Sequence, residues 1–188
     1  MALTTQSIVK AALDVLNAEG LDSVTTRRLA KALGVQGPAL YKHVHSKKEL
    51  LGLMVTSMFA DGLSRLQPSA SWQDWLRQLG NNFRSSMLCY RDSALMVAAA
   101  WPAEPMRQDI VPPLNEPMIA AGFCANDASF VFSMIAAFVL GHVLTEQSDP
   151  QLSFLLRGGR PNIEASFNQQ LEIIIAGVAS RLTHTRGA

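Results

Sequence analysis

Three consecutive polar side chains, Tyr41, Lys42 and His43, are the part of this chain best suited to contact a charged partner. They stand between Leu40 and Val44, whose spacing puts both apolar side chains on one helix face and the polar three outward. A phenol, an ammonium group and an imidazole can all donate hydrogen bonds to phosphates or base edges. Residues 23–48 also hold six Lys or Arg and no Asp or Glu. This indicates a nucleic-acid contact, although a solvated helix face explains the charge alone equally well.

Two short helices joined by a tight turn would present these side chains. Thr25 is suited to cap the first helix, and Gly34 is suited to end it. Pro38 falls in the first turn of the second helix, where a missing N–H is tolerated. The first helix has an apolar stripe at helical spacing, formed by Leu29, Ala32 and Leu33. The pattern predicts a helix-turn-helix whose second helix lies in the major groove of DNA.

Charge and composition separate this segment from the rest of the chain. Residues 1–50 have a net charge of +3 and residues 51–188 one of −2, so a nucleic-acid contact is expected at one end. A chain of 188 residues with 48% hydrophobic residues can bury a sizeable core. The two cysteines, Cys89 and Cys124, predict buried thiols in a reducing compartment and no disulfide framework.

The sequence indicates a soluble, cytoplasmic protein with no membrane partner. Residues 1–6 contain no cationic segment leading into an apolar run, so no secretory signal is expected. The most apolar stretch, residues 130–140, is interrupted only by Ser133. It is shorter than the roughly 20 residues that a helix needs to span a bilayer.

Helical periodicity continues along the chain, and no alternating β-branched run bounded by hairpin turns is present. The fold class is therefore predicted to be all-α. The expected helices cover about 5–19, 46–66, 72–89, 127–146 and 162–182, and a short apolar segment covers 94–101. The expected N-caps of the later long helices are Ser46, Ser71, Asp127 and Asn162. Residues 102–117 contain five prolines, so any helix there should be broken or kinked, and residues 147–161 should form a loop.

Two of these helices are too apolar for the surface of a monomer. The helix over 127–146 is hydrophobic almost all round, and the last helix contains three consecutive isoleucines, residues 173–175. A small helical domain can surround one such helix more easily than two. We therefore expect both helices to pack against their copies in a two-fold homodimer, with a compact monomer as the alternative.

The N-terminal residues resemble the DNA-binding domain of the TetR family of transcriptional repressors. The matching segments are residues 21–30, 33–35, 38–44 and 47–51. A weaker similarity to the tetracycline-binding members continues through residues 71–77, 83–84, 90–92, 121–123 and 140–144. The resemblance implies a helix-turn-helix domain over residues 1–47 and an effector-binding and dimerisation domain over residues 48–188, with the helix at about 46–66 connecting them.

The resemblance also implies specific DNA contacts on a palindromic double-stranded operator. Thr26 and Arg27 would touch phosphate or a base at the groove edge, while Tyr41 and Lys47 would bind phosphates. The residues that would face base edges are Gln36, Gly37, Pro38, Ala39, Lys42 and His43.

The implied small-molecule effector differs from tetracycline. Tetracycline-binding members hold the drug and its magnesium with polar residues and a histidine, and a magnesium chelate needs such hard donors. The corresponding positions here are Leu63, Leu79, Val97, Ala100, Leu114 and Thr145, and only the aromatic residue at Phe83 is retained. We therefore expect a hydrophobic or aromatic effector and neither metal nor cofactor. The candidate effector contacts, each of which could instead be plain core, are Phe83, Met87, Met96, Val97, Trp101 and Phe132.

The sequence also bears on two other classes of function, an enzyme and a DNA-binding regulator without an effector. An enzyme is disfavoured because the sequence has no GxSxG motif, no phosphate-binding glycine loop and no His/Cys/Glu cluster at metal-ligand spacing. The pair His43 and His45 lacks a third ligand, and His142 is expected to be a hydrogen-bonded core or interface residue. The remaining alternative is a DNA-binding regulator without an effector, whose C-terminal domain serves dimerisation or protein contact.

Overall fold

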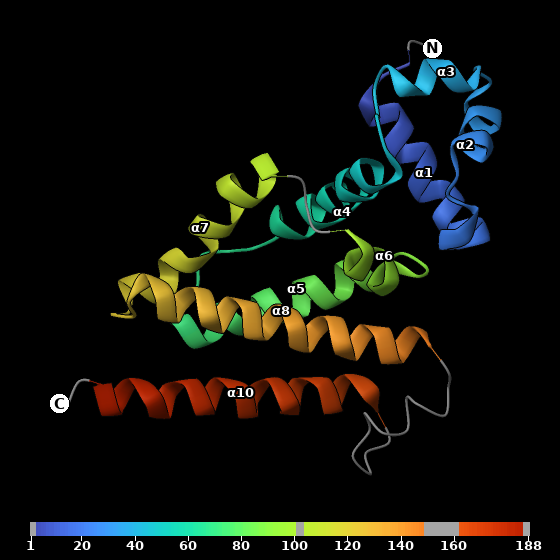
Figure 1. Cartoon of the computed structure of the whole chain (residues 1–188). Helices are drawn as coiled ribbons and strands as arrows, with labels where there is room; N and C mark the ends of the chain where they lie inside the picture. Colours follow the sequence, from blue (N-terminus) through green and yellow to red (C-terminus); the bar gives the residue numbers. More distant parts are fainter. Residues whose placement is uncertain (1–2, 101–103, 149–161, 186–188) are drawn as a thin grey trace.

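The computed structural model describes residues 3–100, 104–148 and 162–185, and every regular element within these ranges is a helix (Figure 1). The all-α prediction is therefore confirmed. A small N-terminal unit lies at one end of the molecule, and α4 leads from it into a larger group of helices. The long helices α8 and α10 lie on the side of this group away from the N-terminal unit.

The N-terminal unit consists of α1 (Thr5–Glu19), a short 3-10 helix (Leu21–Ser23), α2 (Thr26–Leu33) and α3 (Gly37–Tyr41). The side chain of Thr4 caps α1 by accepting a hydrogen bond from the Ser7 amide at 3.1 Å. The buried face of α1 is formed by Ile8, Val9, Ala12, Leu13, Val15 and Leu16. This apolar face packs against α2 and the start of α4, so the unit has its own small core.

The turn between α2 and α3 follows the predicted chemistry. Thr25 Oγ1 accepts a hydrogen bond from the Arg28 amide at 3.2 Å, and Gly34 ends α2 in the left-handed conformation at φ 66°. Ala32 is exposed, however, and the neighbouring Ala30 is buried in its place. The predicted stripe was wrong at this position, because α2 packs with a slightly different face toward α1.

The helix α4 (Lys47–Leu63) begins at the predicted cap and ends earlier than expected. Ser46 Oγ accepts a hydrogen bond from the Glu49 amide at 3.0 Å, while the Glu49 carboxylate accepts one from the His45 amide at 2.7 Å. The cap thus satisfies two N-terminal donors. The helix ends at Leu63 rather than Leu66, where Ser64 Oγ donates to the Asp61 carbonyl.

The larger group of helices contains α5 (Trp72–Leu88), α6 (Ser93–Ala99), α7 (Glu104–Ala120), α8 (Ala125–Gln147) and α10 (Ile163–Thr185). Its centre is α8, which contacts the other four. The predicted caps Ser71 and Asn162 are confirmed, since each side chain accepts a hydrogen bond from the first turn of its helix. Helix α8 is capped by Cys124, whose Sγ accepts from the Asp127 amide, and so it starts before the predicted cap at Asp127.

From Glu104 onward the proline-rich segment forms one helix, α7, so the expected break is absent from this described part, while the alternative of a kink stays a prediction. Pro112, Pro113 and Pro117 all lie inside α7. Each proline removes one backbone donor, but packing compensates, because Leu114 and Met118 are buried in the core. Trp75 Nε1 on α5 also donates a hydrogen bond to the Leu114 carbonyl at 2.9 Å. Tertiary contacts therefore hold a helix that the local sequence disfavours.

Both cysteine thiols are exposed, so the prediction of buried thiols was wrong. Cys89 is the C-cap residue of α5, and Cys124 is the N-cap residue of α8. These are end positions, where a side chain remains near solvent.

Helix α8 is 23 residues long, and by length and composition it could cross a membrane. This differs from the expectation based on residues 130–140 alone. Within the described structure its contacts with α5, α6, α7 and α10 make it the central helix of the bundle. Only 33% of its most apolar window is buried, so a large apolar surface is left open on it.

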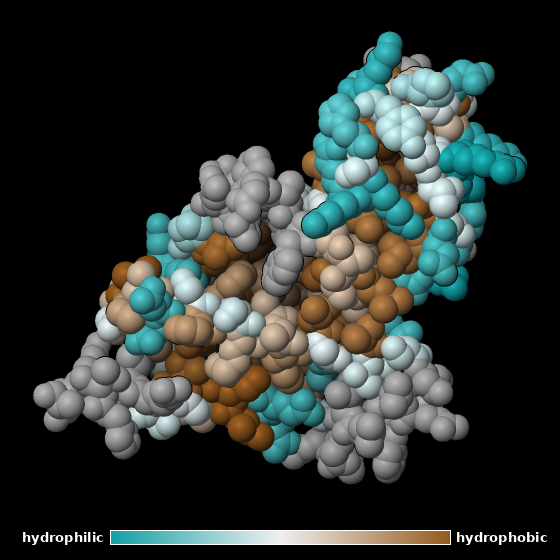
Figure 2. Space-filling model, viewed as in Figure 1, coloured by the Kyte–Doolittle hydropathy of each residue, from teal (hydrophilic) through white to brown (hydrophobic). Residues whose placement is uncertain are grey.

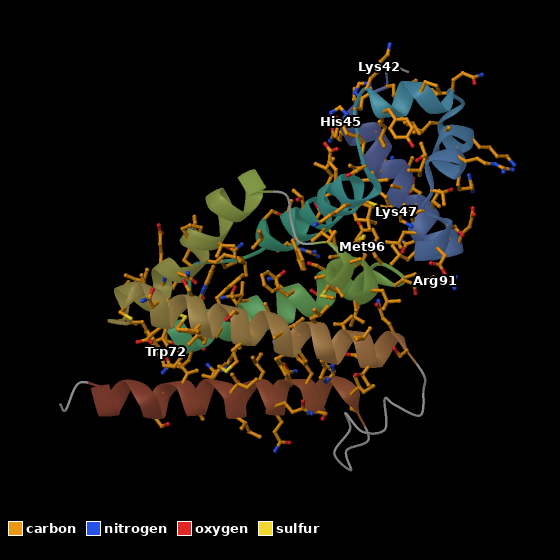
Figure 3. All side chains as sticks on the ribbon, in the orientation of Figure 1. Lys42, His45, Lys47, Trp72, Arg91 and Met96 are labelled. Atoms are coloured by element: carbon orange, nitrogen blue, oxygen red, sulfur yellow. The ribbon has the colours of Figure 1, made fainter. Side chains whose placement is uncertain are left out.

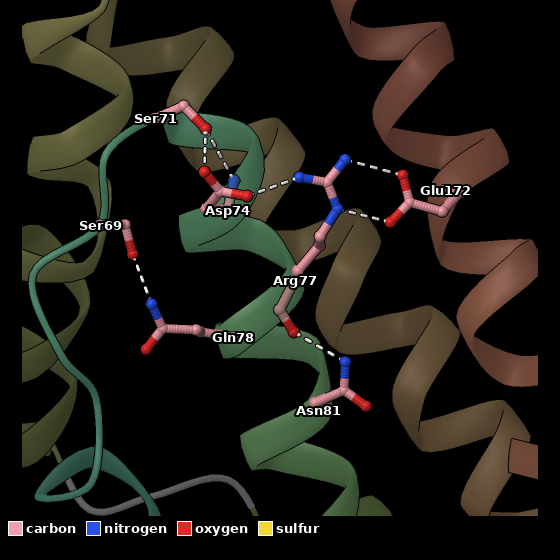
Figure 4. A network of polar contacts seen from close by, with 7 residues as sticks. All are labelled: Ser69, Ser71, Asp74, Arg77, Gln78, Asn81 and Glu172. Atoms are coloured by element: carbon pink, nitrogen blue, oxygen red, sulfur yellow. Dashed lines mark hydrogen bonds and ion pairs between the residues drawn. The ribbon is translucent and has the colours of Figure 1, made fainter.

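Two clusters of ion pairs connect α5 to α10 and to α8. Arg77 on α5 donates to Asp74 at 2.7 Å and to Glu172 on α10 at 2.8 Å (Figure 4). Deeper in the core, Arg84 donates two hydrogen bonds of 2.8 Å to the Glu146 carboxylate on α8. His142 Nδ1 lies 2.6 Å from the same carboxylate, which confirms the prediction of a hydrogen-bonded core histidine.

The Glu146 cluster predicts a pH-dependent contribution to stability. Burial raises the pKa of the Glu146 carboxyl, but hydrogen bonds from His142 and Arg84 outweigh it and hold this pKa below its usual value. We expect Glu146→Gln to lower the free energy of unfolding by about 2 kcal/mol at pH 7, because it weakens a nearly buried ion pair. An unfolded glutamate has a pKa of about 4.3, so the wild-type advantage should be full above that pH, decline below it, and disappear once the pH falls through the lowered pKa of the folded state.

Urea unfolding of both proteins at pH 7 and at pH 3.5 measures this difference. The exposed Glu116 on α7 provides a matched control, since Glu116→Gln should change stability by less than about 0.5 kcal/mol. An equal loss for Glu146→Gln at both pH values would contradict the assigned role of the charge.

Candidate DNA-binding surface and effector core

The predicted DNA-contacting residues gather around α3 at the outer end of the N-terminal unit. Figure 2 shows hydrophilic residues over this unit and apolar ones over the helices below it. Tyr41 is 54% exposed, while Leu40 and Val44 on either side of the polar group are buried, as predicted. Lys42 is exposed at the end of α3 (Figure 3). His43 is half-buried.

The start of α3 is open to a close approach. Gln36 is exposed, and its side chain makes no capping hydrogen bond. A Cβ placed on Gly37 would meet no atom within 4 Å, and Pro38 beside it is exposed. Ala39 is half-buried. Short side chains therefore leave the helix backbone accessible, and the N-terminus of α3 can lie near base edges.

The remaining predicted contacts lie at the first residues of α2 and α4. Thr26 is half-buried and Arg27 is exposed at the start of α2, and Lys47 is exposed at the start of α4. A cavity of about 290 Å³ in the N-terminal unit brings Thr26, Tyr41 and Lys47 together with His45. His45 was not predicted as a DNA contact, although its position two residues from His43 was noted. Donors from three elements thus converge on one surface.

Arg28 differs from its neighbour Arg27 because it is already paired. Its Nε donates to the Glu19 carboxylate at 2.8 Å. The hydrogen bond from Arg28 lowers the pKa of Glu19, and the same bond raises that of Arg28. The pair joins α2 to α1, so Arg28 serves the fold of the unit and Arg27 remains available.

The loop before α6 connects the N-terminal unit to the larger group of helices. Asp92 has φ 53°, the one positive φ of a non-glycine residue in the described ranges. Its Oδ2 accepts a hydrogen bond from the Leu21 amide at 2.9 Å, and the Arg91 amide donates to Asn17 at 2.9 Å. Gly20 at φ 86° leaves room for Asp92, since a Cβ there would lie 2.9 Å from Asp92 Oδ2. This hydrogen bond joins residues 71 apart in the sequence, and helical spacing does not predict it.

The predicted effector contacts lie in and around the core. Phe83, Met87, Met96 and Val97 are buried, and Phe132 is half-buried. Trp101 lies outside the described residues. Phe83 lies with its ring centroid 5.0 Å from that of Phe59 on α4 and 6.0 Å from that of Phe132 on α8. Three helices thus contribute to one aromatic cluster, of which Phe59 was not predicted.

The residues at the tetracycline-binding positions do not fit a magnesium chelate. Leu79, Val97, Ala100 and Leu114 are buried apolar residues, and Leu63 and Thr145 are half-buried. Within residues 3–100, 104–148 and 162–185 no group of three or more His, Cys, Asp or Glu could hold a metal ion. Five of the six positions that the resemblance matches to tetracycline contacts therefore carry apolar side chains, which supply no hard donor, and the sixth carries the hydroxyl of Thr145.

Comparison with known proteins assigns the chain to a family. Residues 8–54 match the model of the bacterial regulatory proteins of the tetR family, and residues 65–161 match the tetracyclin repressor-like C-terminal domain. The tetracycline repressor class A from transposon 1721 of Escherichia coli is 35% identical over 95% of this chain and 92% of its own length.

Two solved structures extend the likeness to the fold. A TetR variant from Acinetobacter baumannii, solved in complex with minocycline, has a TM-score of 0.78 and 32% identity over 96% of this chain and 98% of its own. BioQ, solved with its double-stranded DNA operator, has a TM-score of 0.74 and 26% identity over 95% and 99% of the two chains. The family consists of DNA-binding regulators rather than enzymes. This chain belongs to the TetR family of transcriptional regulators.

Proposed function

We propose that this protein is a homodimeric repressor that binds a palindromic operator and leaves it when a small hydrophobic or aromatic effector enters its core. In this proposal residues 1–47 bind DNA through the α3 surface, and residues 48–188 bind the effector and form the dimer. The effector is not tetracycline. The observation that carries the proposal is an apolar core, at Leu79, Val97, Ala100 and Leu114, inside a protein that is otherwise similar to tetracycline repressors.

The exposed residues of α8 and α10 support the dimer. Phe130 is 72% exposed, Met134 42% and Ile173 65%. All three line one groove of about 1180 Å³ between α8 and α10. A soluble monomer rarely leaves such a contiguous apolar patch open, whereas a two-fold axis through it would cover it with its own copy.

The Asp92 contact supports a route from the effector to the DNA-binding surface. Met96 and Val97 on α6 are among the proposed effector contacts, and α6 begins directly after Asp92. A ligand that shifts α6 would therefore act on the hydrogen bond between Asp92 and Leu21. In a dimer, a small rotation of each N-terminal unit changes the spacing of the two α3 helices, which must match one turn of DNA.

A mobility-shift assay tests the proposal. Full-length protein is combined with DNA from upstream of its own gene, and the complex is challenged with a panel of lipophilic and aromatic compounds. We expect at least one compound to release the DNA, while tetracycline with magnesium leaves the complex intact. If DNA binds but no compound releases it, a regulator whose C-terminal domain serves only dimerisation or protein contact is favoured.

A further inference from the structure

Asn115 on α7 has an incomplete set of hydrogen bonds. This residue is 6% exposed, and its Nδ2 donates to Ser129 Oγ on α8 at 3.0 Å. Its Oδ1 is buried and has no hydrogen-bond partner in the part of the chain that the structure describes. A buried amide oxygen without a donor is unfavourable and calls for an explanation in a native structure. The position is therefore a candidate for a contact with a molecule other than the chain itself.

Asn115 pairs with a face of α8 that also carries one of the proposed effector contacts, Phe132. Ser129 and Phe132 are three residues apart and so lie on one face of α8. Phe132 meets Phe83 edge to face at 6.0 Å. On the other side, the carbonyl of Leu114 accepts the hydrogen bond from Trp75 at 2.9 Å, which fixes α7 at this level. The hydrogen bond between Asn115 and Ser129 thus joins α7 to the face of α8 that carries Phe132, and Phe132 contacts Phe83 on α5.

The other partnerless polar atoms of the described residues are enclosed by packing. Ser86 Oγ faces the backbone of Gly62 so closely that a Cβ there would collide with it. His142 Nε2 belongs to a ring that packs against Phe138 at 5.8 Å and Phe167 at 4.9 Å. Asn115 instead pairs with Ser129, which is exposed, so its neighbourhood reaches the surface between α7 and α8. Of the three residues, Asn115 is therefore the one whose polar neighbour is exposed.

We propose that Asn115 anchors the effector, and that its Oδ1 accepts a hydrogen bond from a hydroxyl or N–H group on an otherwise aromatic molecule. The inference rests on the proposed function and narrows its effector class. The bond to Ser129 uses one N–H of the amide, and Oδ1 has no partner among the described residues. An effector with a donor is then favoured over the same molecule in which the donor is methylated, because the latter leaves Oδ1 buried and unpaired.

Binding of two matched probes, 1-naphthol and 1-methoxynaphthalene, tests this inference on full-length protein by isothermal titration calorimetry. Wild-type protein should bind 1-naphthol at least about tenfold more tightly than the methyl ether. Asn115→Leu should reduce this ratio to about one by weakening the binding of 1-naphthol. The control Asn126→Leu makes the same change at an exposed position of α8 and should keep the wild-type ratio.

A second measurement separates an anchor from a structural amide. If Oδ1 has no hydrogen-bond partner until a ligand binds, Asn115→Leu should raise the melting temperature of the effector-free protein, because it removes an unpaired buried group. A lower melting temperature together with an unchanged probe ratio would overturn the inference. Tighter binding of 1-acetonaphthone than of 1-naphthol would also overturn it, since an acceptor would then be required.

The failure of this inference can be told apart from the failure of the proposed function. Release of the operator by an apolar compound without any donor, at equal concentrations for wild type and Asn115→Leu, would overturn the anchor and leave the proposed function standing. If wild-type protein binds 1-naphthol more tightly than its methyl ether and Asn115→Leu abolishes this preference, the anchor is supported. If, in addition, no compound releases the operator, the proposed function is contradicted. The absence of binding of either probe to wild-type protein would overturn the anchor.

Discussion

Replacing Tyr41 and Lys42 together by alanine is expected to weaken operator binding by about 100-fold at fixed salt concentration. Tyr41 is 54% exposed and Lys42 is exposed at the end of α3, so neither side chain is needed for the core. A hydrogen bond to phosphate and a charged contact with a base edge each contribute about 1–2 kcal/mol, and 1.4 kcal/mol is a factor of ten in affinity. The loss is measured by fluorescence anisotropy with a labelled operator.

Single substitutions distinguish the two proposed kinds of contact. Lys42→Ala should weaken binding to the operator more than binding to unrelated DNA, because Lys42 is assigned to base edges. Lys47→Ala should weaken both about equally and reduce the slope of log affinity against log salt by about one. Arg65→Ala is the control, since it removes an exposed positive charge near the end of α4 and should leave affinity within about twofold. If the Tyr41 and Lys42 double variant binds the operator like wild type, α3 is not the recognition helix.

The parts of the structure that could be predicted from sequence are those decided by local chemistry. Thr25, Gly34 and Ser46 act on backbone groups a few residues away, so their residue types were sufficient to place both ends of α2 and the start of α4. Leu40 and Val44 are buried as their spacing predicted, but the expected helix was too long, because α3 ends at Tyr41 and Val44 lies beyond it. The proposed DNA-binding surface depends on the same short-range features, so the structure could be compared directly with the predicted positions, while the DNA contacts themselves stay a prediction.

The features that sequence could not predict depend on distant partners. The helical state of the segment with Pro112 and Pro113 rests on packing and on a hydrogen bond from Trp75, 39 residues away. The unpaired oxygen of Asn115 depends on the relative position of α7 and α8. The contact between Asp92 and the Leu21 amide joins segments 71 residues apart. The core that is proposed to receive the effector is made of such contacts, so its polar group emerged only from the structure.

The combined substitution Phe130→Asp and Ile173→Asp is expected to convert the protein from dimer to monomer at micromolar concentration. Both side chains are more than 60% exposed and line the groove between α8 and α10, so their replacement leaves the core of the monomer intact. In a two-fold interface each of the two substitutions occurs twice, so a dimer of the double variant would bury four carboxylates in apolar surroundings. Each buried, unpaired charge costs several kcal/mol, which is enough to raise the dissociation constant by more than about 1000-fold.

Sedimentation velocity measures the association state, and circular dichroism verifies that the helices are retained. Leu95→Asp is the matched control, because Leu95 is 50% exposed on α6 outside this groove and its replacement should leave the dimer intact. The monomeric variant should also lose specific operator binding, since one α3 helix then reaches only one half-site and the affinity gained from the second is lost. A wild-type protein that sediments as a monomer, or a double variant that remains a dimer, would show that the two apolar helices are covered in some other way. If the double variant is monomeric, the apolar surface of α8 and α10 is the dimer interface. That interface then also sets the distance between the two DNA-binding units.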